Sequence, residues 1–427
     1  MNKSNNFRRF LVLFSFGIAY GFMYVMPYMK SSFYDQMIAA MGVTNAQLGA
    51  LMTYYTIALT ISYLPGGWIG DRFKPKPVLL VSIFGQAILS FLFMVTYKSY
   101  TMAILIWVLM ALTGGFAFWP SLMKGIRMLG KDEEQGRIYG IFAALNGVGS
   151  LILSFVMLGV MAVVGKASLV TGFRSALAFM GGLSIVSGLL ILFFFDGKAT
   201  FGDPEKKDES ASFSLRDFGA TFKIPGVWIM SLLVWSFVTV LAAASYLTPY
   251  STSVLGLSPA LAASMGMIRT YGCRLVGGPL GGFIADKGFK SVGKEQIFGN
   301  AFCLVTIALF LFVPTGMNQG VLIAMILLVG VAMFTINGTM FSIQSELGIP
   351  VRMSATAINI ATLIGYLPDM FVHTLFGKWL DQYGDAGYRT IFIYTIVTTA
   401  IAIVVAFIAV NQAKKVAARK KAEEESA

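Results

Sequence analysis

The chain has 427 residues, of which 57% are hydrophobic and only 12% are charged, whereas about a quarter are charged in an ordinary soluble protein. A soluble domain of this length cannot bury so much apolar surface, so the composition excludes a soluble enzyme and indicates a protein that crosses a membrane several times. The net charge of +12 does not indicate nucleic-acid binding, because the basic residues are scattered between apolar runs. Basic cytoplasmic loops explain such a distribution.

The N-terminal nine residues are polar and basic, and a long apolar run starts at Phe10. This run is too long for the apolar region of a signal peptide and lacks a small-residue cleavage site, so it predicts an uncleaved first span. Tyr20, Tyr24 and Tyr28 recur every four residues along it. Such a stripe is typical of helix packing or of anchoring at the interface, and Tyr24 is its candidate for solute contact.

A lysine, Lys30, ends this first span. A helix that starts at Arg9 rises about 31 Å by that point, which places Lys30 at the outer rim of the membrane. A longer, tilted helix would instead bring it to a solute cavity. The sequence leaves both positions open.

About 20 apolar residues cross a bilayer as a helix. By this rule the sequence predicts an all-α membrane protein with twelve spans, near residues 8–30, 45–69, 77–97, 101–123, 137–163, 173–195, 225–248, 259–285, 296–314, 319–343, 354–377 and 389–411. The spans form two bundles of six, at 1–195 and 224–413. A charged stretch, 196–223, is the predicted cytoplasmic linker between them, and 414–427 is a basic cytoplasmic tail.

The distribution of Lys and Arg predicts the orientation of these spans. Of the 32 basic residues, 24 lie on the cytoplasmic side if both termini are inside, two lie within a span, and six fall on the opposite side. This excess is the positive-inside pattern. We therefore expect a multi-pass protein of the cytoplasmic (inner) membrane of a bacterium with both termini in the cytoplasm.

Two stretches that lie 215 residues apart have nearly the same sequence, Gly66–Arg72 and Gly281–Lys287. The same offset carries Arg137 onto Arg352, and each of these arginines precedes an apolar run. The chain is therefore predicted to be a duplicated unit. Duplicated halves related by an axis along the membrane normal are a transporter architecture.

Two arginines lie within the eighth span, where ionisable groups are costly and usually face a cavity or a partner. Arg274 precedes Asp286 by 12 residues, which places it about 18 Å from the cytoplasmic end, near the middle of the membrane. It is the candidate for solute binding, and neutralisation by a carboxylate such as Asp369 is the alternative. Arg269 lies about 140° further around the helix and nearer the outer surface, where it either snorkels or binds solute.

Asp369 and His373 lie one turn apart in the eleventh span and share a face. A carboxylate next to an imidazole suits proton coupling. The alternative is a hydrogen bond that packs helices, or an ion pair of Asp369 with an arginine. Pro368 precedes the pair and predicts a kink in this span.

The duplicated stretch resembles the loop motif between the second and third spans of the major facilitator superfamily, G-x-x-x-D-R-x-G-R-R/K. The departure is that Lys74 and Pro75 stand where the motif has Gly-Arg. Together with twelve spans and the repeat, the resemblance covers essentially the whole chain. It implies that glycines, carboxylates and basic groups near the cytoplasmic ends form a gate: Gly67, Asp71, Arg72, Gly282, Asp286 and Lys287.

Other residues are similar to the organophosphate/phosphate antiporter branch of this superfamily and its organic-anion symporter relatives. They are Gly17-x-x-Tyr20-Gly21 through Lys30, and Trp119-Pro120-x-x-x-Lys124. The branch has an Arg-Lys pair where this chain has Met29-Lys30, and its arginine in the seventh span has no counterpart. The resemblance implies a cavity position for Lys30. Lys124 is either part of the gate or an ordinary basic residue of the cytoplasmic loop.

These features predict a secondary active transporter of a small organic anion, such as a sugar phosphate, sugar acid or carboxylate, because cations outnumber carboxylates in the spans. The expected partners are the solute, a proton or exchanged anion, and lipid, for a monomer that binds no nucleic acid. No cofactor or metal is expected, since Cys273, Cys303 and His373 have no metal-ligand spacing. The alternatives are proton-coupled efflux of drugs or metabolites, and a solute receptor without transport.

Overall fold

The structure is a computed structural model that describes residues 3–129, 135–165, 168–196, 215–314, 316–350 and 353–425. The described residues form helices and connecting turns. They divide into two compact units, one made of 1–207 with 258–267, and the other of 208–257 with 268–427. The predicted linker, 196–223, lies mostly outside the described residues.

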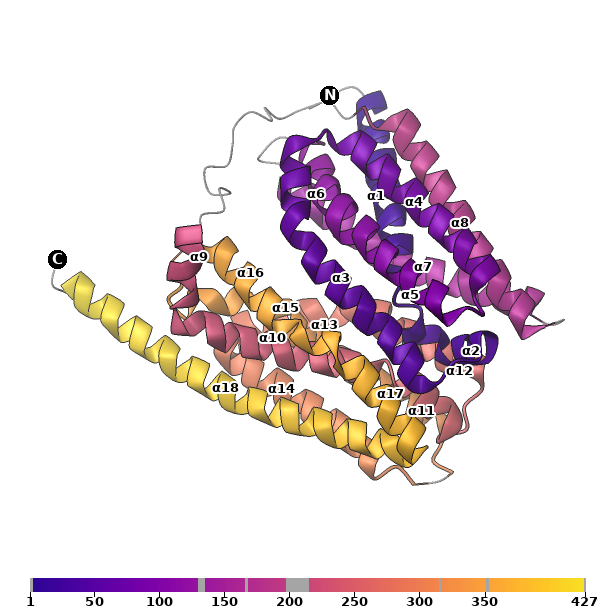
Figure 1. Ribbon diagram of the computed structural model, residues 1–427. Coiled ribbons are helices and arrows are strands. Elements are labelled where there is room, and N and C mark those ends of the chain that lie inside the picture. Colours follow the sequence, from indigo (N-terminus) through magenta and orange to yellow (C-terminus); the bar gives the residue numbers. More distant parts are fainter. Residues whose placement is uncertain are drawn as a thin grey trace. The chain divides into compact units, whose positions relative to one another are not determined.

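The first unit contains the indigo to magenta helices of Figure 1. Its helices are α1 (Lys3–Val25), α2 (Lys30–Met41), α3 (Asn45–Arg72), α4 (Pro75–Thr96), α5 (Tyr100–Ala111), the π-helix η1 (Leu112–Phe118), α6 (Trp119–Arg127), α7 (Gln135–Val164), α8 (Leu169–Phe194) and α12 (Pro259–Met267).

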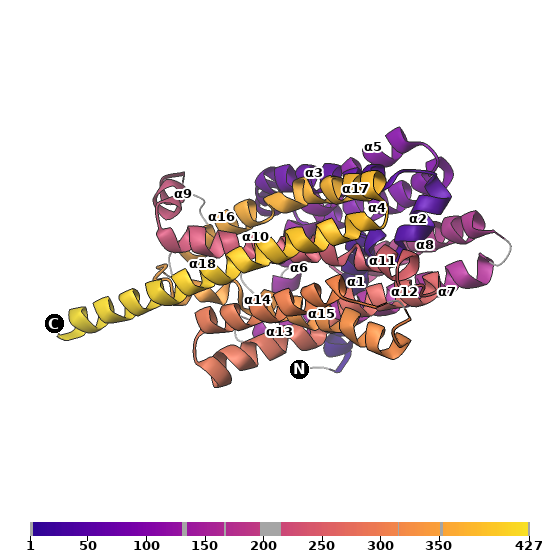
Figure 2. The same ribbon diagram turned by 90° about the horizontal axis from the view of Figure 1, so that it is seen from below.

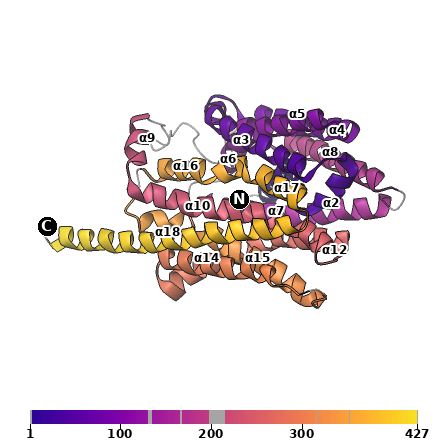
Figure 3. The same ribbon diagram turned by 60° about the horizontal axis from the view of Figure 1, so that its bottom comes forward.

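The second unit begins with α9 (Leu215–Phe222) and ends with the yellow α18 (Figure 1). Its other elements are α10 (Pro225–Ala244), α11 (Leu247–Ser253), the π-helix η4 (Ile268–Gly272), α13 (Cys273–Phe283), the π-helix η5 (Ile284–Phe289), α14 (Val292–Ala308), η6 (Leu309–Leu311), α15 (Gln319–Thr339), η7 (Ser342–Ser345), α16 (Ser354–Gly365), η9 (Leu367–Met370), α17 (Val372–Tyr383) and α18 (Ala386–Glu425). α18 packs along α10 and α14 (Figure 3).

Ten helical segments of the described residues are long and apolar enough to cross a membrane. The two remaining predicted spans, 45–69 and 259–285, are also helical, as α3 and as α12 followed by η4 and α13. The predicted all-α membrane fold is confirmed. Many apolar side chains on these helices, such as Val81, Ile88 and Val163, are exposed, as lipid-facing residues are in a bilayer.

Several predicted spans differ from continuous helices or from their predicted bounds. The predicted first span ends early, because α1 stops at Val25 and a turn leads into α2 at Lys30. The kink predicted at Pro368 is confirmed, since the short helix η9 separates α16 from α17. α18 does not stop near 411 but continues through the predicted tail to Glu425 (Figure 2).

The repeat predicted from the sequence appears as two equivalent helix crossings. A Cβ on Gly66 would lie 2.8 Å from the Gly115 carbonyl oxygen of η1, and a Cβ on Gly281 would lie 2.2 Å from the Thr335 carbonyl oxygen of α15. Gly115 of η1 and Gly330 of α15 are also 215 residues apart. Gly115 packs against Leu59 and Ser62 of α3, and Gly330 packs against Arg269 of η4 and Cys273 of α13. The same close approach of backbones therefore occurs in both units.

Candidate functional site

The second unit interrupts its first long helix inside the bundle. α10 ends at Ala244, and α11 starts at Leu247 after a turn. The Tyr246 hydroxyl in this turn donates to the His373 carbonyl oxygen at 2.6 Å, and the Thr248 hydroxyl accepts from Arg269. The break therefore brings buried polar groups of α11, η4 and α17 to one region of the unit.

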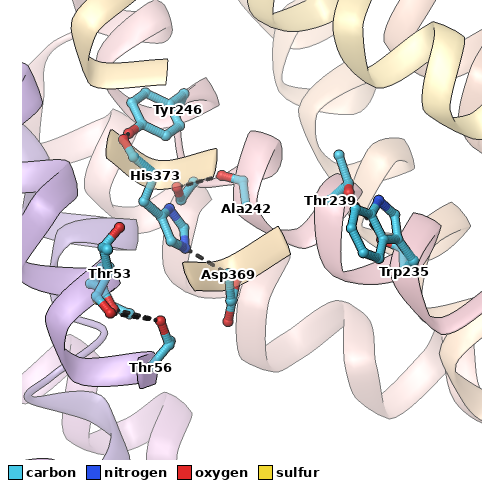
Figure 4. A network of polar contacts seen from close by, with 10 residues as sticks. Thr53, Thr56, Trp235, Thr239, Ala242, Tyr246, Asp369 and His373 are labelled. Atoms are coloured by element: carbon cyan, nitrogen blue, oxygen red, sulfur yellow. Dashed lines mark hydrogen bonds and ion pairs between the residues drawn. The ribbon is translucent and has the colours of Figure 1, made fainter. Parts of the chain in front are cut away.

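The predicted pair of Asp369 and His373 is formed. His373 Nε2 lies 3.2 Å from Asp369 Oδ1 (Figure 4), and both side chains are buried. Asp369 lies in η9 and His373 in the first turn of α17, so the kink after Pro368 and the helical spacing position the pair together. A buried carboxylate and imidazole in contact are able to hold and pass one proton.

Arg269 lies in the π-helical segment η4 and is only 1% exposed. Its Nη2 donates to Thr248 Oγ1 at 3.4 Å, a long hydrogen bond, while Nε and Nη1 have no partner among the described residues. Gly330 of α15 provides room for it, since a Cβ there would lie 2.9 Å from Arg269 Cγ. The guanidinium is thus buried, with two donor groups unused, and it does not snorkel to the surface.

Arg274 has the opposite environment. It is exposed on α13, next to the exposed side chains of Leu275 and Val276. No ion pair joins it to Asp369 in the described part of the chain, where the contact at Asp369 is with His373. As predicted, the two arginines lie on different sides of the helix. However, the buried one is Arg269, and the solute-binding candidate Arg274 is exposed.

In the first unit, Tyr24 is half-buried within an aromatic cluster. Its ring centroid lies 4.5 Å from that of Tyr20 and 6.5 Å from that of Phe118. Lys30 is only 2% exposed at the start of α2. It therefore does not lie in water at the outer rim of the membrane, where a straight helix from Arg9 would place it. The turn after Val25 redirects the chain and buries it.

The predicted gate residues have varied surroundings. Lys124 Nζ donates to the Phe73 carbonyl oxygen, the C-cap of α3, at 3.2 Å. Arg72, Asp286 and Lys287 are exposed. The surroundings of Gly67 and Asp71 lie outside what the structure describes. Gly282 has open space where a Cβ would stand, and the close helix approach is made by Gly281.

Sequence reasoning missed Glu295. It lies in the first turn of α14 and is fully buried, so the spans contain a buried carboxylate besides Asp369. The predicted ninth span starts at 296, four residues after α14 begins at Val292, and left Glu295 in a loop. The polar Gln296 and Asn300, both buried on the same helix, were the available signal that the helix begins earlier.

Comparison with known proteins identifies the relatives of this chain. The sequence model of the Major Facilitator Superfamily matches residues 10–373. The inner membrane protein YihN of Escherichia coli (strain K12) is 26% identical over 374 residues, which cover 87% of this chain and 88% of that protein.

Two further relatives have names that state a solute. The probable sulfoacetate transporter SauU of Cupriavidus necator is 25% identical over 293 residues, 63% of each chain. The probable galactarate/D-glucarate transporter GudP of Escherichia coli (strain K12) is 23% identical over 296 residues, 62% of each chain.

The fold has solved counterparts. The crystal structure of a bacterial homologue of the human lysosomal transporter Spinster, inward-facing and unoccupied, matches with a TM-score of 0.78 at 16% identity. The match covers 97% of this chain and 99% of that one. At this identity the match concerns the fold.

Proposed function

Because the chain belongs to the major facilitator superfamily, a family of membrane transporters, we propose that it moves a small organic anion across the cytoplasmic membrane by alternating access. Arg269 is the observation that carries this proposal. A buried cation without a counter-charge is costly, and no carboxylate of the described residues pairs with this guanidinium. An anionic solute would supply the missing charge and accept from Nε and Nη1.

The relatives support the same solute class. Sulfoacetate, galactarate and D-glucarate, which appear in the names of two of them, are all small anions. A planar guanidinium binds a carboxylate or sulfonate through two parallel hydrogen bonds. We therefore propose that Arg269 is the main anion-binding residue of the second unit, with Arg274 as a further contact. Tyr24 and Lys30 are the proposed solute contacts of the first unit.

The remaining parts of the proposal concern coupling, gating and orientation. Asp369 and His373 carry the coupled proton unless an exchanged anion drives transport. The residues at the ends of α3 and η5, together with Lys124, close the cytoplasmic gate. The hydrogen bond from Lys124 to the C-cap of α3 supports this role. Both termini lie in the cytoplasm, and the monomer is the transporting unit.

Binding to the purified protein tests the solute class. The probes are sulfoacetate, galactarate, D-glucarate and a sugar phosphate, with a neutral sugar and a nucleoside as comparisons. A ligand that binds only the folded state raises the melting temperature. We expect an anion to do so and the neutral compounds not to.

Arginine variants then test the residue. Arg269→Ala removes the shift, and Arg269→Lys weakens binding about tenfold or more, since a hydrogen bond to a charged group contributes about 1.5–3 kcal/mol. Arg274→Ala is the matched variant on the exposed face of the next turn, and we expect a smaller loss. Normal anion binding by both alanine variants, or stabilisation by neutral compounds alone, would contradict the proposal.

A further inference from the structure

A second buried polar cluster lies in the second unit, between α10, α14 and α15. Its centre is Glu295, with Gln296 and Asn300 on the same helix, Thr339 on α15 and Ser236 on α10. All five residues are buried. Because one member is a carboxylic acid, the charge of this cluster depends on a single proton.

The two carboxyl oxygens of Glu295 differ in their surroundings. Oε2 accepts hydrogen bonds from the Thr339 hydroxyl and from Gln296 Nε2, the latter at 3.1 Å. Oε1 is buried and has no hydrogen-bond partner. It points into the space left by the missing side chain of Gly299, where a Cβ would lie 3.2 Å from it.

The other members of the cluster cannot serve Oε1. Gln296 Nε2 is already shared between Glu295, the Ile336 carbonyl oxygen at 3.1 Å and Thr339 Oγ1 at 2.8 Å. Asn300 Nδ2 donates to the Gln296 carbonyl oxygen, and its Oδ1 accepts from Ser236. The Gln296 Oε1 atom is itself an unpartnered acceptor. Glu295 Oε1 and Gln296 Oε1 are therefore both buried acceptors without a donor, and a proton on Glu295 Oε1 would remove the negative charge from this cluster.

Among the described residues, no charged side chain forms an ion pair with Glu295. α15 and α10, which carry Thr339 and Ser236, contain no ionisable residue within their bounds, and neither does η7. The acid that directly follows η7, Glu346, accepts instead from the Val292 and Gly293 amides and from Ser291 at the start of α14. Lys287 of η5 and Lys414, Lys415 and Arg419 of α18 are exposed.

We propose that Glu295 is a proton-binding site of this transporter. In the conformation described here the proton is bound and Glu295 is a neutral acid, because a buried carboxylate without a counter-charge is unfavourable. When the site opens to water, the O–H bond breaks and the proton passes to water. The coupling of this step to solute movement rests on the proposed function, whereas the bound proton does not.

Infrared spectroscopy of the purified protein tests the bound proton without any solute. A protonated carboxylic acid has a C=O stretching band that a carboxylate lacks. We expect this band at neutral pH to be reduced by one acid in Glu295→Gln and to be unchanged in Asp385→Asn, a matched control that removes an exposed acid of the same unit. An unchanged band in Glu295→Gln, in protein that melts like the wild type, overturns the proposal.

Transport in proteoliposomes tests the coupling. Glutamine has the shape of the protonated acid, so Glu295→Gln should retain solute exchange and lose accumulation driven by a pH gradient, while Asp385→Asn retains both. Accumulation by Glu295→Gln at the wild-type level shows that the proton is structural and overturns the coupling. Stabilisation by Na⁺ but not K⁺ that disappears in Glu295→Gln identifies the site as a sodium site and overturns the proposal. Transport of no anion by the wild type refutes the proposed function and leaves the infrared result standing.

Discussion

Tyr246 connects the two buried groups to which we assign solute and proton binding. Its hydroxyl donates to the backbone of His373, and the turn that contains it ends next to Thr248, the partner of Arg269. Its ring also packs edge-on against Phe376 at a centroid distance of 5.6 Å. Tyr246 therefore fixes the position of α17 relative to the break between α10 and α11.

We expect Tyr246→Phe to lower stability by about 1 kcal/mol, the usual net contribution of one hydrogen bond. The ring packing is retained, so the loss reports the hydroxyl alone. Thermal unfolding of the purified variant measures the effect. Tyr250→Phe is the control, since this buried tyrosine donates over 3.3 Å to Phe310 and should lose less. An equal or larger loss of stability in Tyr250→Phe would show that the Tyr246 hydrogen bond contributes no more to stability than that of Tyr250.

Residue pairs within one helix turn were predictable, and contacts between distant helices were not. The i,i+4 spacing was sufficient to place Asp369 beside His373. The burial of Arg269 depends on Gly330, which comes 61 positions later and leaves room at the crossing with α15. Because nothing near Arg269 encodes this space, its depth along the helix favoured Arg274 instead.

At the scale of elements, the duplicated glycines set how closely helices approach. Gly66 and Gly281 face the backbone of the neighbouring helix in their own units. Gly115 and Gly330, on those neighbouring elements, pack against residues of α3 and of η4 and α13. The sequence repeat pointed to this region, but the family motif drew attention to Gly67 and Gly282. In the second unit Gly281, and not Gly282, makes the contact, and Gly66 is its counterpart in the first unit.

Alanine substitutions separate the two glycines of the second unit. In Gly281→Ala the new methyl group meets the Thr335 carbonyl oxygen, so α13 and α15 must move apart. We expect a loss of at least about 1–3 kcal/mol, as for other overpacked sites. Gly282→Ala, with open space around the new methyl, should melt near the wild-type temperature. If both variants melt alike, this crossing is not as tight as described.

At the scale of the whole molecule, the fold class was predictable mainly from the composition and the internal repeat. A bilayer requires long apolar helices, so the number of spans and the all-helical class were readable from the sequence. The breaks within spans were harder to predict. The π-helices η1, η4 and η5 contain no proline, and Pro27 in the turn after Val25 lies within an apolar run that is long enough to cross the bilayer as one helix. Tertiary packing determines those positions.

The proposed orientation makes a prediction for the second unit. Asp385 lies between α17 and α18, and Lys290 lies between η5 and α14; both are exposed. In a variant with Cys273 and Cys303 replaced by alanine, a cysteine at 385 should react with an impermeant maleimide added to intact cells. A cysteine at 290 should react only after the membrane is opened. The reverse pattern would place both termini outside.

The length of α18 has a mechanical consequence. Forty residues of helix extend about 60 Å, roughly twice the thickness of the hydrocarbon core. Where Val416 packs against Gly348, the helix is still held by its own unit, and beyond this point it projects as a stiff arm. A rotation of the unit by about 10° would swing Glu425 through about 10 Å, given this length. A fluorophore attached to the end of α18 would therefore move far when the unit tilts only slightly. This displacement is large enough to follow in single molecules.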